Sequence, residues 1–149
     1  MKISIGCDHG GFELKLGVID WLKDSKYIVI DLGNNVYNIN DDYPDFAEMV
    51  SRNVISGKSQ RGIIICGSGV GACIAANKIS GVRASVCHDT YSARQGVEHD
   101  NMNILCLGAR VIGDQLAKEL ISAFLSATFL NKSRYNKRLE KIKNLENKK

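Results

Sequence analysis

The sequence predicts an α/β fold, a three-layer αβα sandwich around a five-stranded parallel sheet of the Rossmann-like or flavodoxin-like kind. Five short apolar or β-branched segments alternate with segments of helical spacing along 149 residues. Residues 62–66 (GIIIC) form an unbroken apolar run, which is typical of a parallel strand covered on both faces. The length, with 44% hydrophobic and 24% charged residues, suits one globular domain over residues 1–149.

The first half of the chain is predicted to run strand, helix, strand, loop and helix. Residues 2–6 (KISIG) alternate and include β-branched side chains, which is typical of a strand, and residues 12–23 follow as a helix. Residues 27–33 (YIVIDLG) form a second expected strand closed by a glycine turn, before a polar loop over residues 34–43. Pro44 suits the first turn of a helix, whose inner face is expected to carry Phe46, Met49, Val50, Asn53 and Val54.

The second half continues the alternation of strands with helices. The expected strands lie at residues 62–66, 83–87 and 103–108. The expected helices that follow them lie at residues 70–79, 90–99 and 113–126. The last of these has five apolar side chains on one face: Leu116, Leu120, Ile121, Phe124 and Leu125. A basic helix is expected at about residues 133–147, with a narrow apolar seam of Leu139, Ile142 and Leu145.

Basic residues gather in the last segment of the sequence. Residues 131–149 hold eight Lys or Arg against two Glu, whereas the whole chain carries a net charge of only +4. A basic segment in a chain whose other residues are mildly acidic favours binding of an anion, although a solvated helix end would give the same pattern. Because no aromatic stacking platform accompanies these cations, we expect no nucleic-acid partner.

The five cysteines are expected to be free thiols in a cytoplasmic protein. Their number is odd and no Cys/His spacing typical of zinc occurs, so no metal site is predicted. The first residues (MKISIGCDHG) lack the apolar core and cleavage site of a secretory signal. No segment has the ~20 apolar residues that span a bilayer, so we expect no membrane partner.

Chemically useful side chains follow the expected strands at their carboxyl ends, where ligands bind in open parallel sheets. They fall in four segments: residues 7–9, 66–69, 87–89 and 108–110. One run joins a strand to a helix N-terminus and forms a candidate anion cradle, made of Gly67, Ser68, Gly69, Val70 and Gly71. It would hold a phosphate, or an oxyanion that exists only during reaction; a tight turn that needs positive φ is the structural alternative.

A dinucleotide site is an alternative interpretation of the same glycines. Gly67, Gly69 and Ala72 fit the G-x-G-x-x-G/A spacing, and Asp89 lies about 20 residues further on, where a ribose-binding acid belongs. Two features argue against this interpretation. The glycine turn of that motif normally follows the first strand of its unit, and here it follows the third. The motif also leaves unexplained a cysteine at the end of the strand.

The individual candidates each have a functional and a structural interpretation. A thiolate at Cys66 would be stabilised by the helix N-terminus and could serve as a nucleophile or base, but free cysteines are often core residues. Ser68 supplies a hydroxyl in the same loop. The other candidates are Asp8, His9, His99 with its neighbour Asp100, and the phosphate-type cations Arg110, Arg134 and Arg138. Either histidine could instead be a capping or surface residue.

Six segments, in order along the chain, resemble type B ribose-5-phosphate isomerase, a family that also contains galactose-6-phosphate isomerase subunits. They are GCDHGGFELK near the start, DYPDFA at 42–47, GIIICGSGVGACIAANK at 62–78, RASVCHDTYSA at 83–93, NILCLGARVIG at 103–113 and SRYNKRLEKI at 133–142. The resemblance implies interconversion of D-ribose 5-phosphate and D-ribulose 5-phosphate through an enediolate, with no metal, nucleotide or other cofactor.

The resemblance also implies roles in the proton transfers. Cys66 matches the general base that moves a proton between C2 and C1. One branch of the family uses a glutamate in the following helix instead, and this chain has Ala72 at that position. Ser68 matches a hydroxyl that helps to move the proton between the two oxygens. The amides of residues 67–71 would stabilise the enediolate.

Further matches concern the sugar, the phosphate and the assembly. Asp8 and Tyr43 match residues near the sugar, and His99 matches the group that opens the furanose ring. The expected phosphate ligands are His9, Arg110, Arg134 and Arg138. Members of the family are homodimers, some pairing into tetramers, with sites shared between subunits. His99 and Arg110 are therefore expected from the neighbouring subunit.

Three departures from the family pattern bear on substrate choice. Asp100 stands where many members have Asn, Lys132–Ser133 replaces Gly-Gly, and Tyr135 replaces His. An isomerase for a six-carbon sugar phosphate, such as allose or galactose 6-phosphate, is therefore kept as an alternative. A nucleotide-binding module is the less favoured one.

Overall fold

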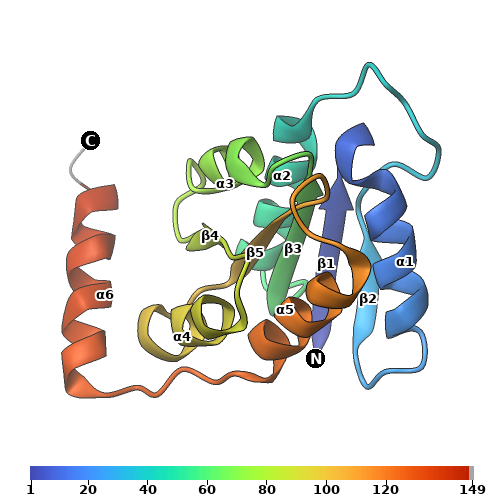
Figure 1. The fold of residues 1–149 in the computed structure, drawn as a ribbon. Helices are drawn as coiled ribbons and strands as arrows, with labels where there is room; N and C mark the ends of the chain where they lie inside the picture. The colour runs from blue at the N-terminus through green and yellow to red at the C-terminus, as the bar shows by residue number, and fades with distance from the viewer. Residues whose placement is uncertain (148–149) are drawn as a thin grey trace.

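The structure, a computed structural model, describes residues 1–147. Its strands form one parallel sheet in the order β2-β1-β3-β5-β4 (Figure 1). The strands are β1 (Lys2–Cys7), β2 (Ile28–Asp31), β3 (Arg61–Cys66), β4 (Ala84–Val86) and β5 (Ile104–Gly108). The helices are the 3₁₀ turn η1 (His9–Gly11), α1 (Phe12–Leu22), α2 (Tyr43–Ile55), α3 (Val70–Ala76), α4 (Thr90–Asp100), α5 (Asp114–Ser126) and α6 (Ser133–Glu146).

Helices cover both faces of the sheet, which confirms the predicted αβα sandwich. Side chains of α1, α4 and α5 pack on one face, and side chains of α2 and α3 pack on the other, in two separate buried clusters. Parallel strands need a crossover between them, and the helices supply it. Each helix therefore returns the chain to the amino ends of the strands, and the last residues of all strands lie together at the carboxyl end of the sheet.

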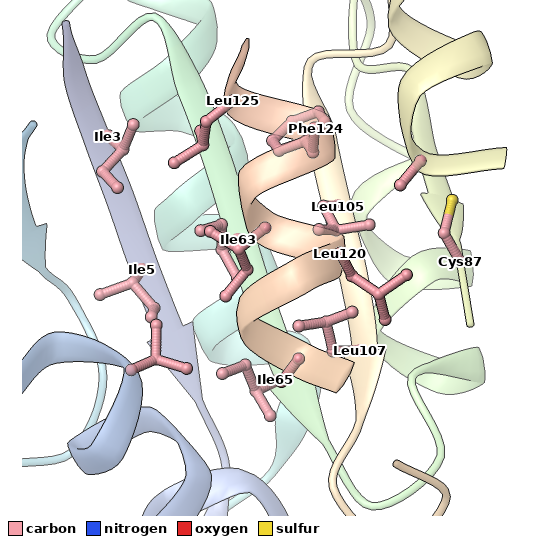
Figure 2. Packing of buried hydrophobic residues seen from close by; sticks show 14 of the residues in the cluster. Ile3, Ile5, Ile63, Ile65, Cys87, Leu105, Leu107, Leu120, Phe124 and Leu125 are labelled. Atoms are coloured by element: carbon pink, nitrogen blue, oxygen red, sulfur yellow. The ribbon is translucent and has the colours of Figure 1, made fainter. Parts of the chain in front are cut away.

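The central strand β3 explains why residues 62–66 are apolar throughout. Ile63 and Ile65 lie in the cluster beneath α5, where Figure 2 shows them pointing toward that helix. Ile64 and Cys66 lie in the cluster beneath α2 and α3. Because β3 pairs with β1 on one side and β5 on the other, neither its faces nor its edges meet water. Each isoleucine buried in this way contributes ~1.5–3 kcal/mol to stability.

The helix α2 matches its predicted start at a proline, but one residue of its predicted inner face is misplaced. Phe46 and Val50 are buried as expected, whereas Met49 is 43% exposed. Met49 lies nearly opposite the buried Ala47 on the helical wheel, so the prediction that it faces inward is wrong. Asn53 has a structural reason to face the sheet, because its Oδ1 accepts a 2.8 Å hydrogen bond from a serine hydroxyl of β1.

The two edge strands are shorter than the sequence predicts. β2 covers four residues rather than 27–33, and β4 covers three rather than 83–87. Each has a single neighbour in the sheet, so fewer ladder hydrogen bonds extend it. The helix α3 likewise ends at Ala76 rather than residue 79. The side-chain amide of Asn77 follows and bonds both backbone groups of Ala84 on the edge of β4, each at 2.9 Å.

The last helix, α6, stands apart from both buried clusters. Figure 1 shows it as the outermost element beside α4, reached by an extended segment after α5. None of its residues is buried, and the predicted apolar seam includes Ile142 at 40% and Leu145 at 67% exposure. Its last turn is attached through Glu146, which accepts hydrogen bonds from Ser80 Oγ and the Gly81 N–H. Across residues 1–147, no helix is long and apolar enough to cross a membrane.

Candidate active site

The carboxyl ends of β1, β3 and β5 meet around a shallow pocket of about 280 Å³, which we call the cysteine pocket. It is lined by Asp8, Tyr43, Cys66, Gly67, Ser68, Gly71, Arg110 and Val111. These residues come from four separate parts of the sequence. Parallel pairing brings them together, since Cys7 lies opposite Ile65 and Cys66 opposite Gly108 in adjacent strands.

Cys66 lies in this pocket at the end of β3, with only 4% of its surface exposed. Its Sγ accepts a hydrogen bond of 3.1 Å from the Gly69 N–H, the kind of donor that a thiolate accepts well. The loop can turn the amide back toward the sulfur because Gly69 adopts φ 81°, in the left-handed region. Ser68 Oγ accepts a bond of 3.3 Å from the Val70 N–H, so the serine side chain also lies within the loop.

The other cysteines have different environments from Cys66. Burial raises the pKa of the Cys7 thiol to about 12, and it also raises the pKa of Cys87. The pKa of Cys73 is lowered to about 7, chiefly by a hydrogen bond with the Cys106 thiol. Cys73 is half-buried on α3, with its Sγ 3.5 Å from the Ala84 carbonyl oxygen, and it does not line the cysteine pocket. Among these thiols, Cys66 is distinguished by its position in the cysteine pocket.

Asp8 and His9 follow β1 and begin one wall of the site. Asp8 caps η1 by accepting a hydrogen bond of 3.2 Å from the Gly11 N–H, and burial raises the pKa of its carboxyl group. His9 is held by Asp41, whose Oδ1 lies 2.8 Å from both Nδ1 and the backbone nitrogen of His9. The hydrogen bond to Asp41 raises the pKa of His9. Within residues 1–147, no hydrogen bond engages the Nε2 atom of His9.

Asp41 holds a predicted site residue and is not itself identified from the sequence, because it lies in a polar loop with no periodicity. Its carboxylate also accepts a hydrogen bond from Asn34 Nδ2, and its side chain is only 7% exposed. The same loop is anchored by Lys15, a fully buried lysine of α1. Its Nζ lies 2.8 Å from both carboxylate oxygens of Asp31 and donates at 2.9 Å to the Asn34 carbonyl oxygen.

Tyr43 and Arg110 complete the cysteine pocket from two sides. A Cβ placed on Gly71 would lie 2.6 Å from the Tyr43 ring, so the ring rests directly on the first turn of α3. The Arg110 N–H donates a 2.9 Å hydrogen bond to the Gly67 carbonyl oxygen, and its guanidinium lies beside the same glycine. The structure therefore places Arg110 at the cysteine loop of its own chain. It corrects the expectation of a neighbouring subunit, because β5 pairs directly with β3.

His99 lies far from this pocket, near the end of α4. Its Nδ1 is 2.8 Å from Gln95 Nε2 and its Nε2 is 3.0 Å from the Tyr135 hydroxyl. The two rings stack with centroids 4.3 Å apart and planes inclined by 20°. Because α4 leads back to the amino end of β5, His99 and Asp100 lie at the amino end of the sheet, whereas Cys66 lies at the carboxyl end. We call the group of Gln95, His99 and Tyr135 the histidine cluster.

The two remaining arginines lie beside the histidine cluster. Arg134 and Arg138 are exposed residues in the first two turns of α6, and they flank Tyr135 in the sequence. Of the predicted site residues, the structure therefore gathers one set around Cys66 and a second set around His99. A single chain does not bring the two sets together.

The alternative dinucleotide site receives little support. Asp89, the candidate ribose acid, caps α4 by accepting a 2.7 Å hydrogen bond from the Ser92 N–H. That carboxylate is therefore already engaged in holding the helix. Within residues 1–147, no group of three His, Cys, Asp or Glu side chains is placed to hold a metal ion.

Comparison with known proteins identifies the family of the chain. A protein-family model described as Ribose/Galactose Isomerase matches residues 3–142. The chain belongs to this family and is an isomerase. Among its relatives, the D-erythrulose-4-phosphate isomerase of Pectobacterium atrosepticum is 44% identical, over 87% of this chain and 85% of that one. Ribose-5-phosphate isomerase B of Escherichia coli is 42% identical, over 97% and 96% of the two chains.

Solved structures of the family have the same fold. Ribose-5-phosphate isomerase B of Clostridium thermocellum superimposes with a TM-score of 0.95 at 48% identity, over 99% of both chains. The enzyme of Mycoplasma genitalium, solved with bound ribulose-5-phosphate, superimposes with a TM-score of 0.93 at 40% identity, over 99% of this chain and 97% of that one.

Proposed function

We propose that this protein interconverts D-ribose 5-phosphate and D-ribulose 5-phosphate, with Cys66 as the general base. The observation that carries the proposal is the position of Cys66 in a chain of this family. Its nearly buried sulfur lies at the end of β3, beneath a glycine loop whose amide already points at it. Asp8, Tyr43 and Ser68, all suited to binding sugar hydroxyls, line the same pocket.

The proposed chemistry needs only proton transfers. The Cys66 thiolate removes the proton from C2 of the open-chain aldose, and the electron pair of that bond forms the C1=C2 double bond of an enediolate. Amides of residues 67–71 stabilise the negative charge that develops on oxygen. Ser68 helps to move a proton from O2 to O1. Return of the first proton from the thiol to C1 then gives the ketose, so no redox partner is consumed.

Phosphate binding is assigned to cations from both sets of residues. The hydrogen bond to Asp41 raises the pKa of His9 and so favours its imidazolium form, and Arg110 lies in the cysteine pocket. Arg134 and Arg138 offer two exposed guanidinium groups, which suit the bidentate recognition of phosphate. Because they lie with the histidine cluster, they reach the cysteine pocket only from a second chain.

The active site is therefore proposed to be shared in a homodimer, in which the cysteine pocket of one protomer receives the histidine cluster of its partner. A two-fold symmetric dimer forms two such sites from one kind of contact. Exposed apolar side chains are available for that contact, among them Val70 and Ile74 of α3 and Tyr91 of α4. A groove of about 450 Å³ lies between α6 and the edge strand β4 and is lined in part by Arg83 and Ile142. It is a further candidate surface for contact with the second protomer. Dimers of this kind could pair further into tetramers.

A second candidate substrate is a four-carbon sugar phosphate. It is supported by the 44% identity to the relative named D-erythrulose-4-phosphate isomerase, which lies between the 42% and 48% identities to the ribose-5-phosphate isomerases B of Escherichia coli and Clostridium thermocellum. A six-carbon substrate is supported by a 37% identical relative from Clostridium acetobutylicum, named galactose-6-phosphate isomerase subunit LacB. Comparing kcat/KM for aldose phosphates of four, five and six carbons ranks the three candidates.

The general base is tested by replacing Cys66 and, as a matched control, Cys73. Loss of a general base lowers the rate about 10²–10⁴-fold, so Cys66→Ala is expected to lose at least 99% of its turnover while keeping its circular dichroism spectrum. Cys73→Ala removes the thiol whose pKa is lowered to about 7, and it is expected to stay active because that thiol lies outside the pocket. A folded Cys66→Ala protein with near-normal turnover would show that the base is another group.

A further inference from the structure

Both ring nitrogens of His99 are occupied within the chain. Gln95 holds Nδ1 at 2.8 Å, and the Tyr135 hydroxyl holds Nε2 at 3.0 Å. Stacking of the two rings fixes this arrangement further, with centroids 4.3 Å apart. An imidazole held in this way has no free nitrogen to offer a sugar. The polar group beside it is the hydroxyl of Tyr135, a residue that is partly exposed.

We propose that Tyr135 is a further catalytic residue, whose hydroxyl touches the sugar and carries protons between it and His99 during ring opening. The proposal rests on the proposed function and on the role in ring opening that the family resemblance implies for His99. In this proposal His99 acts through Tyr135. The proposal also gives a role to a tyrosine at a position where the family often has histidine.

The position of Tyr135 suits the ring oxygen of a pentose 5-phosphate. Arg134 precedes it and Arg138 follows one turn later on α6, so two proposed phosphate ligands flank the hydroxyl. In the furanose form the phosphate is carried by C5, and the ring oxygen is bonded to the adjacent C4. A group placed between phosphate ligands is therefore near the ring oxygen. The hydroxyl bonded to C1 is close by, because C1 is also bonded to the ring oxygen.

The proton transfers balance without a co-reactant. The proton of the C1 hydroxyl passes to Tyr135 Oη while the hydroxyl proton passes to His99 Nε2, and the O–H electron pair forms the C1 carbonyl. The bond between C1 and the ring oxygen breaks, and its electron pair goes to the ring oxygen. The proton returns through Tyr135 to that oxygen. The side-chain amide of Gln95 can donate to or accept from Nδ1, so it accommodates both protonation states of the imidazole.

The test compares a substrate that forms a ring with one that does not. Ribose 5-phosphate is mostly cyclic, whereas D-erythrose 4-phosphate carries its phosphate on the oxygen that would close a furanose. Tyr135→Phe keeps the aromatic stacking and removes the hydroxyl. We expect kcat/KM for ribose 5-phosphate to fall about 10²-fold or more, as for loss of a general acid–base group, with the four-carbon reaction unchanged within threefold. Tyr27→Phe, at a partly exposed tyrosine next to the edge strand β2, is the matched control and is expected to leave both reactions unchanged.

A second measurement covers the case in which the wild-type protein does not accept the four-carbon substrate. With Tyr135→Phe, the rate of ribose 5-phosphate conversion is expected to stop rising with enzyme concentration, because uncatalysed ring opening then supplies the substrate. The wild-type rate should stay proportional to enzyme concentration over the same range. Equal losses on both substrates, an unchanged variant, or a rate proportional to the variant's concentration would overturn the proposal. Wild-type protein inactive on ribose 5-phosphate would instead refute the proposed function itself.

Discussion

The sharing of one active site between two protomers can be tested by mixing two inactive variants. Cys66→Ala removes the thiol of the cysteine pocket, and His99→Asn removes the imidazole of the histidine cluster. Each homodimer carries the same defect in both sites and is expected to lose activity about 10²–10⁴-fold. In a mixed dimer, one site collects both defects and the other collects none, because its thiol and its imidazole come from the chains in which they are intact.

The expected recovery follows from counting sites. Random pairing of equal amounts gives about half mixed dimers, and each has one intact site of two, so the mixture should reach about a quarter of wild-type activity. Co-expression with two different affinity tags allows the mixed dimer to be isolated, and it should then show about half of the wild-type activity. An isolated mixed dimer with no more activity than its parents would refute the shared site, as would elution of the active wild-type protein as a monomer.

Three other substitutions probe the surroundings of the cysteine pocket. Asp41→Asn should lower the pKa of His9, because the carboxylate now raises it; NMR titration should show this. Above pH 7 the variant should then have a higher KM for the phosphorylated substrate than wild type, because its His9 loses the imidazolium proton at a lower pH. Below about pH 6 the two KM values should match, because His9 is protonated in both proteins. Lys15→Met leaves the carboxylate at the end of β2 without its lysine and should lower the free energy of unfolding by about 3 kcal/mol, as measured in urea. Lys23→Met, in an exposed pair, is the matched control and should change the stability much less. Gly71→Ala forces a Cβ against the tyrosine ring of α2. Overpacking of this kind costs about 1–3 kcal/mol, so kcat/KM should fall about tenfold as the ring is displaced. The circular dichroism spectrum should stay that of wild type.

The sheet could be predicted from sequence because hydrophobic patterning determines it locally. An unbroken apolar run such as residues 62–66 has few alternatives to a strand buried on both faces. The position of Cys66 also follows from the sequence, since a strand end and a glycine loop are both local features. The ends of the edge strands and the exposure of Met49 depend on which neighbours pack against them. Patterning alone does not report those neighbours.

The polar contacts of the site depend on residues that lie far apart in the sequence. Asp41 meets His9 across 32 positions, and Tyr135 meets His99 across 36. No spacing rule connects such pairs, so the sequence indicated the histidines and not the residues that hold them. Lys15 was hidden for another reason, because a lysine on a helix is normally solvated, and here it is fully buried against a carboxylate.

The division of the site into two halves could be expected only through the family resemblance, because residue spacing does not place His99 relative to Cys66. His99 was identified as a candidate, but its position opposite Cys66 becomes evident only when the direction of α4 is known. Arg110 was expected from a neighbouring subunit, but it lies against the cysteine loop of its own chain. In both cases the strand order of the sheet decides which residues are neighbours.

The most direct test of the proposed function is the conversion of D-ribose 5-phosphate to D-ribulose 5-phosphate by the purified protein, after dialysis against EDTA and with no nucleotide added. The proposed mechanism uses only side chains and amides of the protein, so rapid turnover is expected under these conditions, with little remaining in Cys66→Ala. A folded wild-type protein that leaves ribose 5-phosphate unchanged would contradict the proposed function.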